Sequence, residues 1–283
     1  MIPSAIILDP LLTVWLQEDI GRGDRTTDGL GLEEIRSGNW VAKDKGVVAG
    51  LPIAGRVFQL LNINVKFTAV VEEGETVKPG QVIATFEGPL NALLTGERLA
   101  LNLAMRLSGI ATMTRKYMDI IADLPTQLVD TRKTTPGLRI LEKYAIGVGG
   151  GRNHRMGLDD GVMIKDNHIK AAGSIQEAIQ AISKTIPYPL TIEVETTTLS
   201  EVEEALTYGA DIIMLDNMEL GLMKQAVTVI RDNNKQVKIE ASGNITLENL
   251  RKVAETGVDY ISSSAPITRS PWLDLSMRLS RKV

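Results

Sequence analysis

Two stretches, GADIIMLD at residues 209–216 and GVDYISSS at residues 257–264, repeat one pattern: a glycine, a short apolar run and a polar end. A Thr-Leu pair precedes each at the same interval, beginning at Thr198 and at Thr246. Each threonine is typical of a helix N-cap, and each glycine of a helix end. Two such helix–strand units in register predict a (β/α) barrel or a related open barrel, with its function at the C-terminal ends of the strands.

Further short, β-branched runs continue the pattern and are separated by helical stretches. Such strands are typical of a parallel sheet that is covered on both faces. The predicted strands lie in QLVDTR (127–132), GVMIKD (161–166), LTIEVET (190–196), ADIIMLDN (210–217), VKIEASG (237–243) and VDYISSS (258–264).

The first part of the chain predicts a smaller α+β domain. Apolar spacing indicates a helix over 9–20, with Asp9 as its cap and Pro10 at its first position. The stretch 21–30 is either a solvated turn or a loop near a site. The stretch 39–88 has β texture around a helix beginning at Leu51, and a long helix follows over 90–122.

Three parts follow from these patterns. We expect an N-terminal α/β sandwich domain over residues 1–115 and an α/β barrel catalytic domain over residues 116–269. The last segment, residues 270–283, is predicted to form a helix that packs back on the first domain.

Composition narrows the function classes. The formal net charge of −4 argues against general nucleic-acid or membrane-surface binding, and the absence of cysteine excludes disulfides and thiolate chemistry. No apolar run is long enough to span a membrane, and the N-terminus lacks a basic, signal-like start. We expect a cytoplasmic protein.

A cationic cluster lies between Asp130 and His168, in DTRKTTPGLRILEKYAIGVGGGRNHRMGLDDGVMIKDNHI. It contains both histidines of the chain and the three glycines 149–151. Cations beside glycines suggest a pocket for a small, highly charged anion. The cationic residues are Arg132, Lys133, Arg139, Lys143, Arg152, His154, Arg155, Lys165 and His168, with Lys170 just beyond.

Acids at the strand ends face this cluster if the barrel forms. They are Glu193, Glu195, Asp216 and Glu240. Glu195 and Asp216 indicate either Mg²⁺ or positive charge that develops during a reaction, while a structural ion-pair network is the alternative. Backbone N–H groups of the turns at 242–244 and 262–264 suit a phosphate, although Ser-Gly-Asn alone is a common turn.

The histidines allow two interpretations. His154 either orients a substrate or is a structural hydrogen-bonding residue, and His168 fits the structural role better. No zinc spacing, dinucleotide fingerprint, phosphate-loop motif or nucleophile elbow is present in the sequence.

The stretch 130–168 closely resembles the defining region of the quinolinate phosphoribosyltransferase family. The resemblance extends to EDIGRGDRTT, GERLALNLAMRLSGIAT, IEVET, MLDN, EASGNI and TGVDYIS, and so covers nearly the whole chain. It implies a sandwich domain with an open barrel of the type II phosphoribosyltransferase kind. It also implies a Mg²⁺-dependent pentosyltransferase of NAD biosynthesis that works as a dimer or an assembly of dimers, turning quinolinate and phosphoribosyl pyrophosphate into nicotinate mononucleotide, pyrophosphate and CO₂.

The resemblance also assigns roles to residues. Arg132, Arg155 and Lys165 would hold the quinolinate carboxylates with His154 nearby, and Thr131 would bind substrate. Arg98 would reach the site of the neighbouring subunit. Lys133 would meet quinolinate or the phosphoribosyl group, and Glu195 and Asp216 would hold ribose hydroxyls and Mg²⁺, with indirect metal contact possible. The catalytic residues would be Lys133, Glu195 and Asp216. The residues implied for the 5′-phosphate are Ser242, Gly243, Asn244, Ser263, Ser264 and Ala265.

One segment departs from the family pattern. Where the family often has Val-Gly-Ala-Leu-Thr-His-Ser, this chain has SSAPITRS at residues 263–270, without the glycine and the histidine. The departure puts the phosphate contacts there in question, although serine hydroxyls and Arg269 offer substitutes. Two other functions stay open: a related phosphoribosyltransferase with another acceptor, such as a paralogue associated with molybdate transport genes, or a non-catalytic anion-binding barrel.

Overall fold

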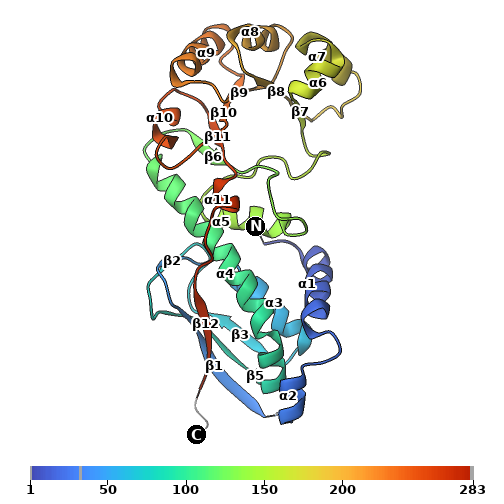
Figure 1. Ribbon diagram of the computed structural model, residues 1–283, viewed down its shortest axis with the longest axis vertical. Coiled ribbons are helices and arrows are strands. Elements are labelled where there is room, and N and C mark those ends of the chain that lie inside the picture. Colours follow the sequence, from blue (N-terminus) through green and yellow to red (C-terminus); the bar gives the residue numbers. More distant parts are fainter. Residues whose placement is uncertain (1, 32–33, 281–283) are drawn as a thin grey trace. The chain divides into compact units, whose positions relative to one another are not determined.

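The computed structural model describes residues 2–31 and 34–280 (Figure 1). These residues form two compact units. The first comprises the chain up to Arg115, Ile140–Gly150, and the part from Arg269 onward. The second comprises Lys116–Arg139 and Gly151–Thr268. The segment Ile140–Gly150, which the sequence placed in the barrel, therefore belongs to the first unit.

An antiparallel sheet organises the first unit. Its strand order is β12 (Leu275–Leu279), β1 (Ile35–Ala42), β5 (Val82–Pro89) and β3 (Lys66–Ala69), while β2 (Gly46–Val47) pairs separately with β4 (Thr76–Val77). Helix α3 (Leu51–Leu61) packs on this sheet through Phe58. The rings of Trp40 and Phe67 meet edge to face at a centroid distance of 5.1 Å, and Phe58 stacks on Phe67. Aromatic burial thus fixes one helix on the sheet.

Helix α1 (Ala5–Ile20) begins earlier than the sequence suggested. Its buried face consists of Leu8, Leu12 and Leu16, of which Leu8 lies before the predicted helix. The prediction that Asp9 caps the helix and Pro10 opens it is wrong, because Ser4 is the N-cap and Pro10 lies inside the helix. The Asp9 carboxylate instead pairs with Arg56, with 2.7 Å between Oδ2 and Nη2.

The stretch after α1 also contains a helix. Asp24 accepts hydrogen bonds from the backbone N–H groups of Thr26 and Thr27 and so caps α2 (Arg25–Leu30). The glycines suggested a turn, but the capping aspartate starts a short helix. The long helix α4 (Leu90–Ile120) is confirmed, and α5 (Arg139–Val148) follows it after strand β6 (Gln127–Val129).

The C-terminal segment is a strand, so the predicted helix over 270–283 is wrong for its described residues. Strand β12 pairs antiparallel with β1, with Val41 opposite Ser276 and Trp40 opposite Met277. The alternation of Leu273, Leu275, Met277 and Leu279 has the period of a strand. The predicted helix over 270–283 did not take this alternation into account.

The second unit contains six parallel strands, as the repeat predicted. Their order is β6 (Gln127–Val129), β11 (Tyr260–Ser262), β10 (Lys238–Ser242), β9 (Ile212–Asp216), β8 (Ile192–Thr196) and β7 (Val162–Ile164). Within the described chain no pairing joins β6 to β7, and Arg152 instead forms a parallel bridge with Val129. The sheet is therefore an open barrel.

Helices connect these strands (Figure 1). They are α6 (Asp166–Ala172), α7 (Ile175–Ile182), α8 (Leu199–Thr207), α9 (Leu220–Asn233), α10 (Leu250–Ala254) and α11 (Ala265–Thr268). The capping box of Thr198 and Glu201 at α8 is confirmed. Thr246 does not cap its helix, because α10 begins at Leu250 with Asn249 as N-cap. Gly209 and Gly257 follow their helices with φ of 85° and 95°, a conformation that favours glycine.

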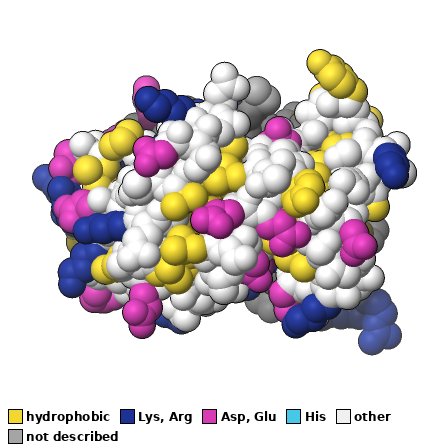
Figure 2. All heavy atoms as spheres, turned by 90° about the horizontal axis from the view of Figure 1, so that it is seen from above, with side chains coloured by type: hydrophobic (Ala, Val, Ile, Leu, Met, Phe, Trp, Pro, Cys, Tyr) yellow, Lys and Arg dark blue, Asp and Glu magenta, His cyan; other side chains and the backbone are white. Residues whose placement is uncertain are grey.

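Among the described residues no helix is long and apolar enough to cross a bilayer. Acidic, basic and apolar side chains are interspersed over the face shown in Figure 2. Such a mixture is typical of a solvated protein surface.

Candidate active site

An ion pair joins the ends of two neighbouring barrel strands. Lys165 follows β7 and Glu195 lies on β8, and Lys165 Nζ is 2.7 Å from Glu195 Oε2. The backbone N–H of Lys165 donates to Nδ1 of His168, which fixes the lysine at the start of α6. His168 therefore has a structural contact, as the sequence predicted. A predicted cation and a predicted acid of the site meet here.

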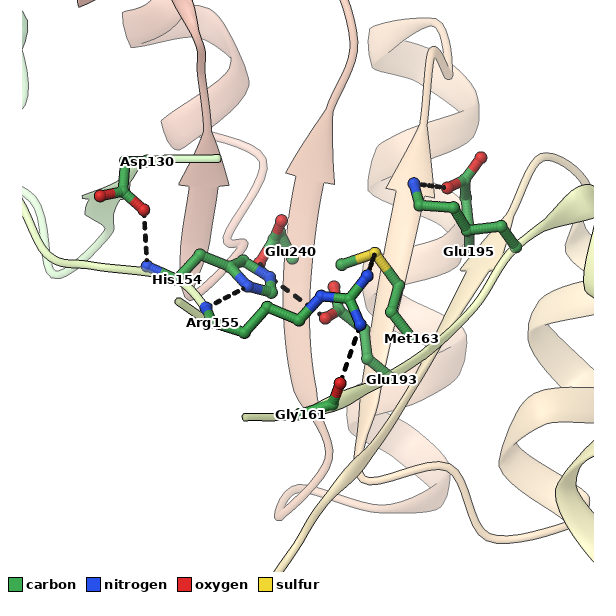
Figure 3. A network of polar contacts seen from close by, with 9 residues as sticks. Asp130, His154, Arg155, Gly161, Met163, Glu193, Glu195 and Glu240 are labelled. Atoms are coloured by element: carbon green, nitrogen blue, oxygen red, sulfur yellow. Dashed lines mark hydrogen bonds and ion pairs between the residues drawn. The ribbon is translucent and has the colours of Figure 1, made fainter. Parts of the chain in front are cut away.

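His154 contacts two buried acids (Figure 3). Its Nε2 lies 3.1 Å from Oε2 of Glu193 on β8 and 3.4 Å from Oε2 of Glu240 on β10. Its Nδ1 accepts the backbone N–H of Arg155 at 2.7 Å, and its own backbone N–H donates to Asp130 at 2.9 Å. Both ring nitrogens therefore contact protein atoms, and Nε2 is the protonated one. We call His154, Glu193 and Glu240 the barrel-floor cluster.

The barrel-floor cluster holds a shared proton. Burial lowers the pKa of His154, but its hydrogen bonds to Glu193 and Glu240 raise that pKa to about 10. Burial also raises the pKa of the Glu193 carboxyl, against the lowering effect of the His154 hydrogen bond. Groups coupled this closely titrate as a unit. His154 therefore shares its Nε2 proton with the carboxylates it contacts, and the cluster holds that proton as a unit.

The donor atoms of the barrel-floor cluster lie within 4.8 Å of one another, a spacing that also suits a metal ion. The hydrogen bond to Nδ1 argues against a metal here. Metal-binding histidines normally donate their second ring N–H, whereas a ring that accepts at Nδ1 and binds metal through Nε2 would be an imidazolate. The contacts fit a hydrogen-bonded network better.

Contacts of the Arg155 side chain hold this residue beside the barrel-floor cluster. One guanidinium nitrogen, Nη1, donates to the carbonyl of Gly161 at 2.8 Å, and Nη2 lies 3.7 Å from Met163 Sδ (Figure 3). Burial lowers the pKa of Arg155, and the positive charge of Arg132 adds to this effect. Two guanidinium charges that act on each other favour an anionic ligand.

Several buried polar atoms in the barrel unit have no hydrogen-bond partner. The register places Glu195 opposite Met214, Met214 opposite Glu240, Glu240 opposite Tyr260, and Tyr260 opposite Gln127. Residues paired across a sheet, and those two apart along a strand, share a face, so four of these atoms point to one side. The atoms are Gln127 Oε1, Glu193 Oε1, Glu240 Oε1 and Ser262 Oγ from the strands and Arg132 Nε from the loop after β6. Unmet hydrogen-bonding capacity of this kind suits a polar ligand or ordered water.

The loop after β6 carries further predicted cations. Thr131 Oγ1 accepts the backbone N–H of Lys133 at 3.0 Å, and the Thr134 N–H donates to the Arg132 carbonyl. Arg139 donates to Thr134 Oγ1, which ties this loop to the start of α5. Lys133 itself is exposed. The loop is thus ordered by hydrogen bonds that leave the Lys133 side chain at the surface.

Asp216 and the turn at 242–244 lie together. The residues Asp216 and Ser242 are opposite each other at the ends of β9 and β10. Asn217 donates from Nδ2 to Asp216 Oδ2 at 2.8 Å and from its backbone to Ser242 O at 2.9 Å. The predicted ribose acid and a predicted phosphate turn are therefore neighbours.

The segment that departs from the family pattern forms a short helix. Ser263 Oγ accepts the backbone N–H of Ala265 at 3.2 Å, and Ser264 O accepts N–H groups of Ile267 and Thr268. These contacts cap α11 from within the chain. The role of residues 263–265 in phosphate binding stays a prediction, and Arg269 is exposed.

Other predicted cations belong to the first unit. Arg98 is exposed on α4. Lys143 is fully buried on α5, next to Glu142, whose Oε1 lies 2.7 Å from Arg106 Nη2. Lys143 is thus buried, and the role of Arg98 stays a prediction.

Sequence reasoning missed two features of this site. Glu193 and Glu240 were recognised as strand-end acids, but not as partners of His154. Asn217 received no role at all. Glu193 and Glu195 are two residues apart on β8, so the sequence indicated that both face the same side of the sheet. Nothing in the sequence indicated the contacts of Asn217.

Known proteins resemble this chain over its full length. The family "Quinolinate phosphoribosyl transferase, N-terminal domain" matches residues 24–108, and the corresponding C-terminal domain matches residues 110–278. A protein named "Probable nicotinate-nucleotide pyrophosphorylase [carboxylating]" from Synechocystis sp. is 61% identical over 99% of this chain and 95% of its own. One of the same name from Bacillus subtilis is 46% identical over 95% of this chain and 92% of its own.

Solved structures agree with the sequence matches. NadC from Streptococcus pyogenes superposes with a TM-score of 0.93 at 40% identity, covering 99% of both chains. The nicotinate-nucleotide pyrophosphorylase from Francisella tularensis gives a TM-score of 0.93 at 36% identity, covering 99% of this chain and 98% of the other. The two-unit fold with an open barrel is therefore shared with these proteins.

Proposed function

The chain belongs to the quinolinate phosphoribosyl transferase family, and we propose that its open barrel joins quinolinate to phosphoribosyl pyrophosphate at the C-terminal ends of the strands. The reaction is phosphoribosyl transfer with decarboxylation. Its products are nicotinate mononucleotide, pyrophosphate and CO₂, in the synthesis of NAD. The two substrates together carry many negative charges, and the cations and unpartnered polar atoms of the barrel unit suit them.

Arg132, Arg155 and Lys165 form the acceptor wall, which binds the two carboxylates of quinolinate. Arg155 is pinned by Gly161 and Met163, so it keeps its orientation without a ligand. Arg132 has a buried Nε without a partner, which is free to bind a carboxylate oxygen. His154 supports this wall through the backbone of Arg155 rather than by direct contact of its ring nitrogens.

Glu195 and Asp216 form the ribosyl wall. Departure of pyrophosphate develops positive charge at the ribose, and nearby carboxylates stabilise that charge electrostatically. The 5′-phosphate binds at Ser242, Gly243 and Asn244, next to Asp216. Lys133, at the surface of the loop after β6, reaches the phosphoribosyl group or quinolinate.

The ribosyl wall also suits Mg²⁺. Carboxylate oxygens are the ligands that this ion prefers, and Mg²⁺ is commonly held by one or two carboxylates together with substrate phosphates. The ribosyl wall offers two carboxylates, of which Glu195 uses Oε2 for Lys165 and Asp216 uses Oδ2 for Asn217. When bound, Mg²⁺ neutralises charge on the leaving pyrophosphate.

The chemistry needs no covalent nucleophile. The ring nitrogen of quinolinate bonds to C1 of the ribose while the bond from C1 to pyrophosphate breaks. The nitrogen then carries positive charge, which stabilises the electron pair left on the ring when the 2-carboxylate departs as CO₂, and that carbon takes up a proton. The acceptor wall orients the ring for both events. The absence of cysteine is compatible with this route.

The observation that carries the proposal is the contact between Lys165 and Glu195, since it joins the acceptor wall to the ribosyl wall. We also propose a homodimer or an assembly of dimers, with Arg98 contributed to the neighbouring site, and a cytoplasmic location. No nucleic-acid or membrane partner is proposed.

The test is product formation by the purified protein. Incubation with quinolinate, phosphoribosyl pyrophosphate and Mg²⁺ is expected to give nicotinate mononucleotide and CO₂ in equal amounts. Lys165→Ala and Arg132→Ala are expected to lose this activity, while Lys170→Ala, an exposed lysine paired with Asp166 on the same helix, is the control. Unchanged quinolinate turnover in both variants would mean that the acceptor wall is wrongly assigned.

A further inference from the structure

Asn217, the residue after β9, contacts Asp216 and all three residues of the turn at 242–244. Its backbone N–H donates to the carbonyl of Ser242 at 2.9 Å. Its side-chain Oδ1 accepts from Asn244 Nδ2 at 3.1 Å, while its Nδ2 donates to Asp216 Oδ2 at 2.8 Å. Gly243 packs directly on it, because a Cβ added to Gly243 would lie 2.2 Å from Asn217 Oδ1. One side chain therefore links an acid to an entire turn.

The backbone around this contact is unusual. Asn217 and Asn244 have φ of 52° and 49°, and they are the two non-glycine residues with positive φ in the described part of the chain. Gly243, between Ser242 and Asn244, has φ of 96°. Left-handed conformations outside glycine tend to occur at functional sites, where the surrounding contacts hold them in place.

A second asparagine holds the turn from the other side. Asn249 Nδ2 donates to the carbonyl of Asn244 at 3.0 Å, and its Oδ1 accepts the backbone N–H of Thr246 at 2.8 Å. The turn is thus fixed at both ends. Asn217 is the only one of these asparagines that also touches an acid of the ribosyl wall, which sets its role apart.

We propose that Asn217 is a positioning residue that couples the Asp216 carboxylate to the turn of Ser242, Gly243 and Asn244. The inference rests on the proposed function, because the ribose and phosphate roles of these residues come from it. Holding Asp216 Oδ2 stops the carboxylate from rotating and leaves its other oxygen for the ligand. The ribose and the 5′-phosphate of phosphoribosyl pyrophosphate then bind cooperatively, since an ordered acid and an ordered turn depend on one side chain.

The residue type fits this role. An amide supplies a donor for Asp216 and an acceptor for Asn244 at once, and asparagine tolerates the left-handed conformation better than other residues with side chains. Aspartate would place a second carboxylate against Asp216, and alanine would offer neither contact. Glycine would keep the backbone conformation while removing the amide, so Asn217→Gly isolates the side-chain contribution.

The test is a comparison of Michaelis constants. In Asn217→Gly, KM for phosphoribosyl pyrophosphate is expected to rise by about 10-fold, because a hydrogen bond to a charged group is lost. KM for quinolinate is expected to stay unchanged, and the affinity for ribose 5-phosphate, measured by calorimetry, is expected to fall by the same factor. Asn233→Gly is the matched control, since Asn233 is also exposed and hydrogen-bonds only its own helix at Val229.

A double variant sharpens the result. If Asn217 and Asn244 act through one link, Asn217→Gly with Asn244→Gly is expected to raise KM for phosphoribosyl pyrophosphate by less than the product of the single effects. A KM for phosphoribosyl pyrophosphate equal to that of the control, or an equal rise in both Michaelis constants with a lower Tm, would overturn the coupling. An Asp216→Asn variant with unaltered kinetics would overturn the ribosyl-wall assignment itself, and the inference with it.

Discussion

Lys165 Nζ lies 2.7 Å from Glu195 Oε2, so a cation of the acceptor wall and an acid of the ribosyl wall neutralise each other without ligands. The lysine side chain is 44% exposed and the glutamate 15%, which leaves the pair accessible. Under the proposed roles, quinolinate carboxylates compete for Lys165 and positive charge at the ribose competes for Glu195. Substrate binding is therefore expected to exchange this ion pair for two new ones.

The exchange predicts different effects for its two partners. Lys165→Ala is expected to raise KM for quinolinate by about 50-fold, since it removes a charge-assisted contact. Glu195→Gln is expected to lower kcat with little change in that KM, because its charge acts at the transition state. Steady-state kinetics with each substrate varied measures both. Lys170→Ala serves as the control, and an equal effect on both parameters in both variants would contradict the separation of the walls.

The fixed guanidinium of Arg155 predicts that a positive charge at this position is not enough to bind quinolinate at full affinity. Arg155→Lys keeps the charge but loses the planar fork and the contacts to Gly161 and Met163, so KM for quinolinate is expected to rise by about 10- to 100-fold. The matched control is Arg231→Lys, whose guanidinium pairs with Asp259 at 2.8 Å in the same unit. Equal quinolinate kinetics in the two variants would refute the carboxylate fork.

The barrel-floor cluster predicts a large effect on stability. His154→Ala leaves Glu193 and Glu240 buried without their common hydrogen-bond donor, and a loss of about 3–5 kcal/mol in the free energy of unfolding is expected. His154→Gln retains an N–H donor and is expected to recover part of the loss. Urea denaturation measures both, and a loss below about 1 kcal/mol for His154→Ala would contradict the structural role.

The same cluster predicts how stability depends on pH. The pKa of His154 is raised from 6.5 to about 10, so the folded state binds more protons than the unfolded state between these values. The stabilisation is fully present below pH 6.5 and is lost as the pH rises toward about 10. Tm measured from pH 6 to pH 10 is expected to fall more steeply in the wild type than in His154→Gln. Parallel curves would show that the cluster carries no shared proton.

Removal of Mg²⁺ tests whether the ribosyl wall binds this ion. Addition of EDTA is expected to abolish product formation without changing Tm, because the acids already pair with Lys165 and Asn217 in the folded protein. Restored Mg²⁺ is expected to restore the rate. Asp216→Asn is expected to raise the Mg²⁺ concentration needed for half-maximal rate, and an unchanged requirement would remove Asp216 from the proposed metal contact.

The barrel could be predicted from the sequence because the patterns that indicate its helices and strands are local. The repeat around residues 209–216 and 257–264 combines helix caps, glycine stops and β-branched runs, and each of these favours the same element in isolation. The C-terminal strand was missed because its partner β1 lies far away in sequence. A short alternating segment gains its conformation from that pairing rather than from its own propensity.

The site was only half predictable for the same reason. Strand ends and residue types located Lys165, Glu195 and Asp216, since parallel strands end at one edge. The partners of His154 depend on the stagger of strands β8 and β10 around the barrel, which composition does not encode. The contacts of Asn217 depend on two left-handed backbone conformations, at Asn217 and Asn244, that no sequence periodicity reveals.

The most direct measurement is a crystal structure of the protein with quinolinate bound. The account predicts the two carboxylates within hydrogen-bonding distance, about 3 Å, of Arg132, Arg155 and Lys165, with the Lys165–Glu195 contact broken. Quinolinate bound elsewhere, or at this mouth with Lys165 still paired to Glu195, would contradict the central claim that the acceptor and ribosyl walls meet at the end of the barrel.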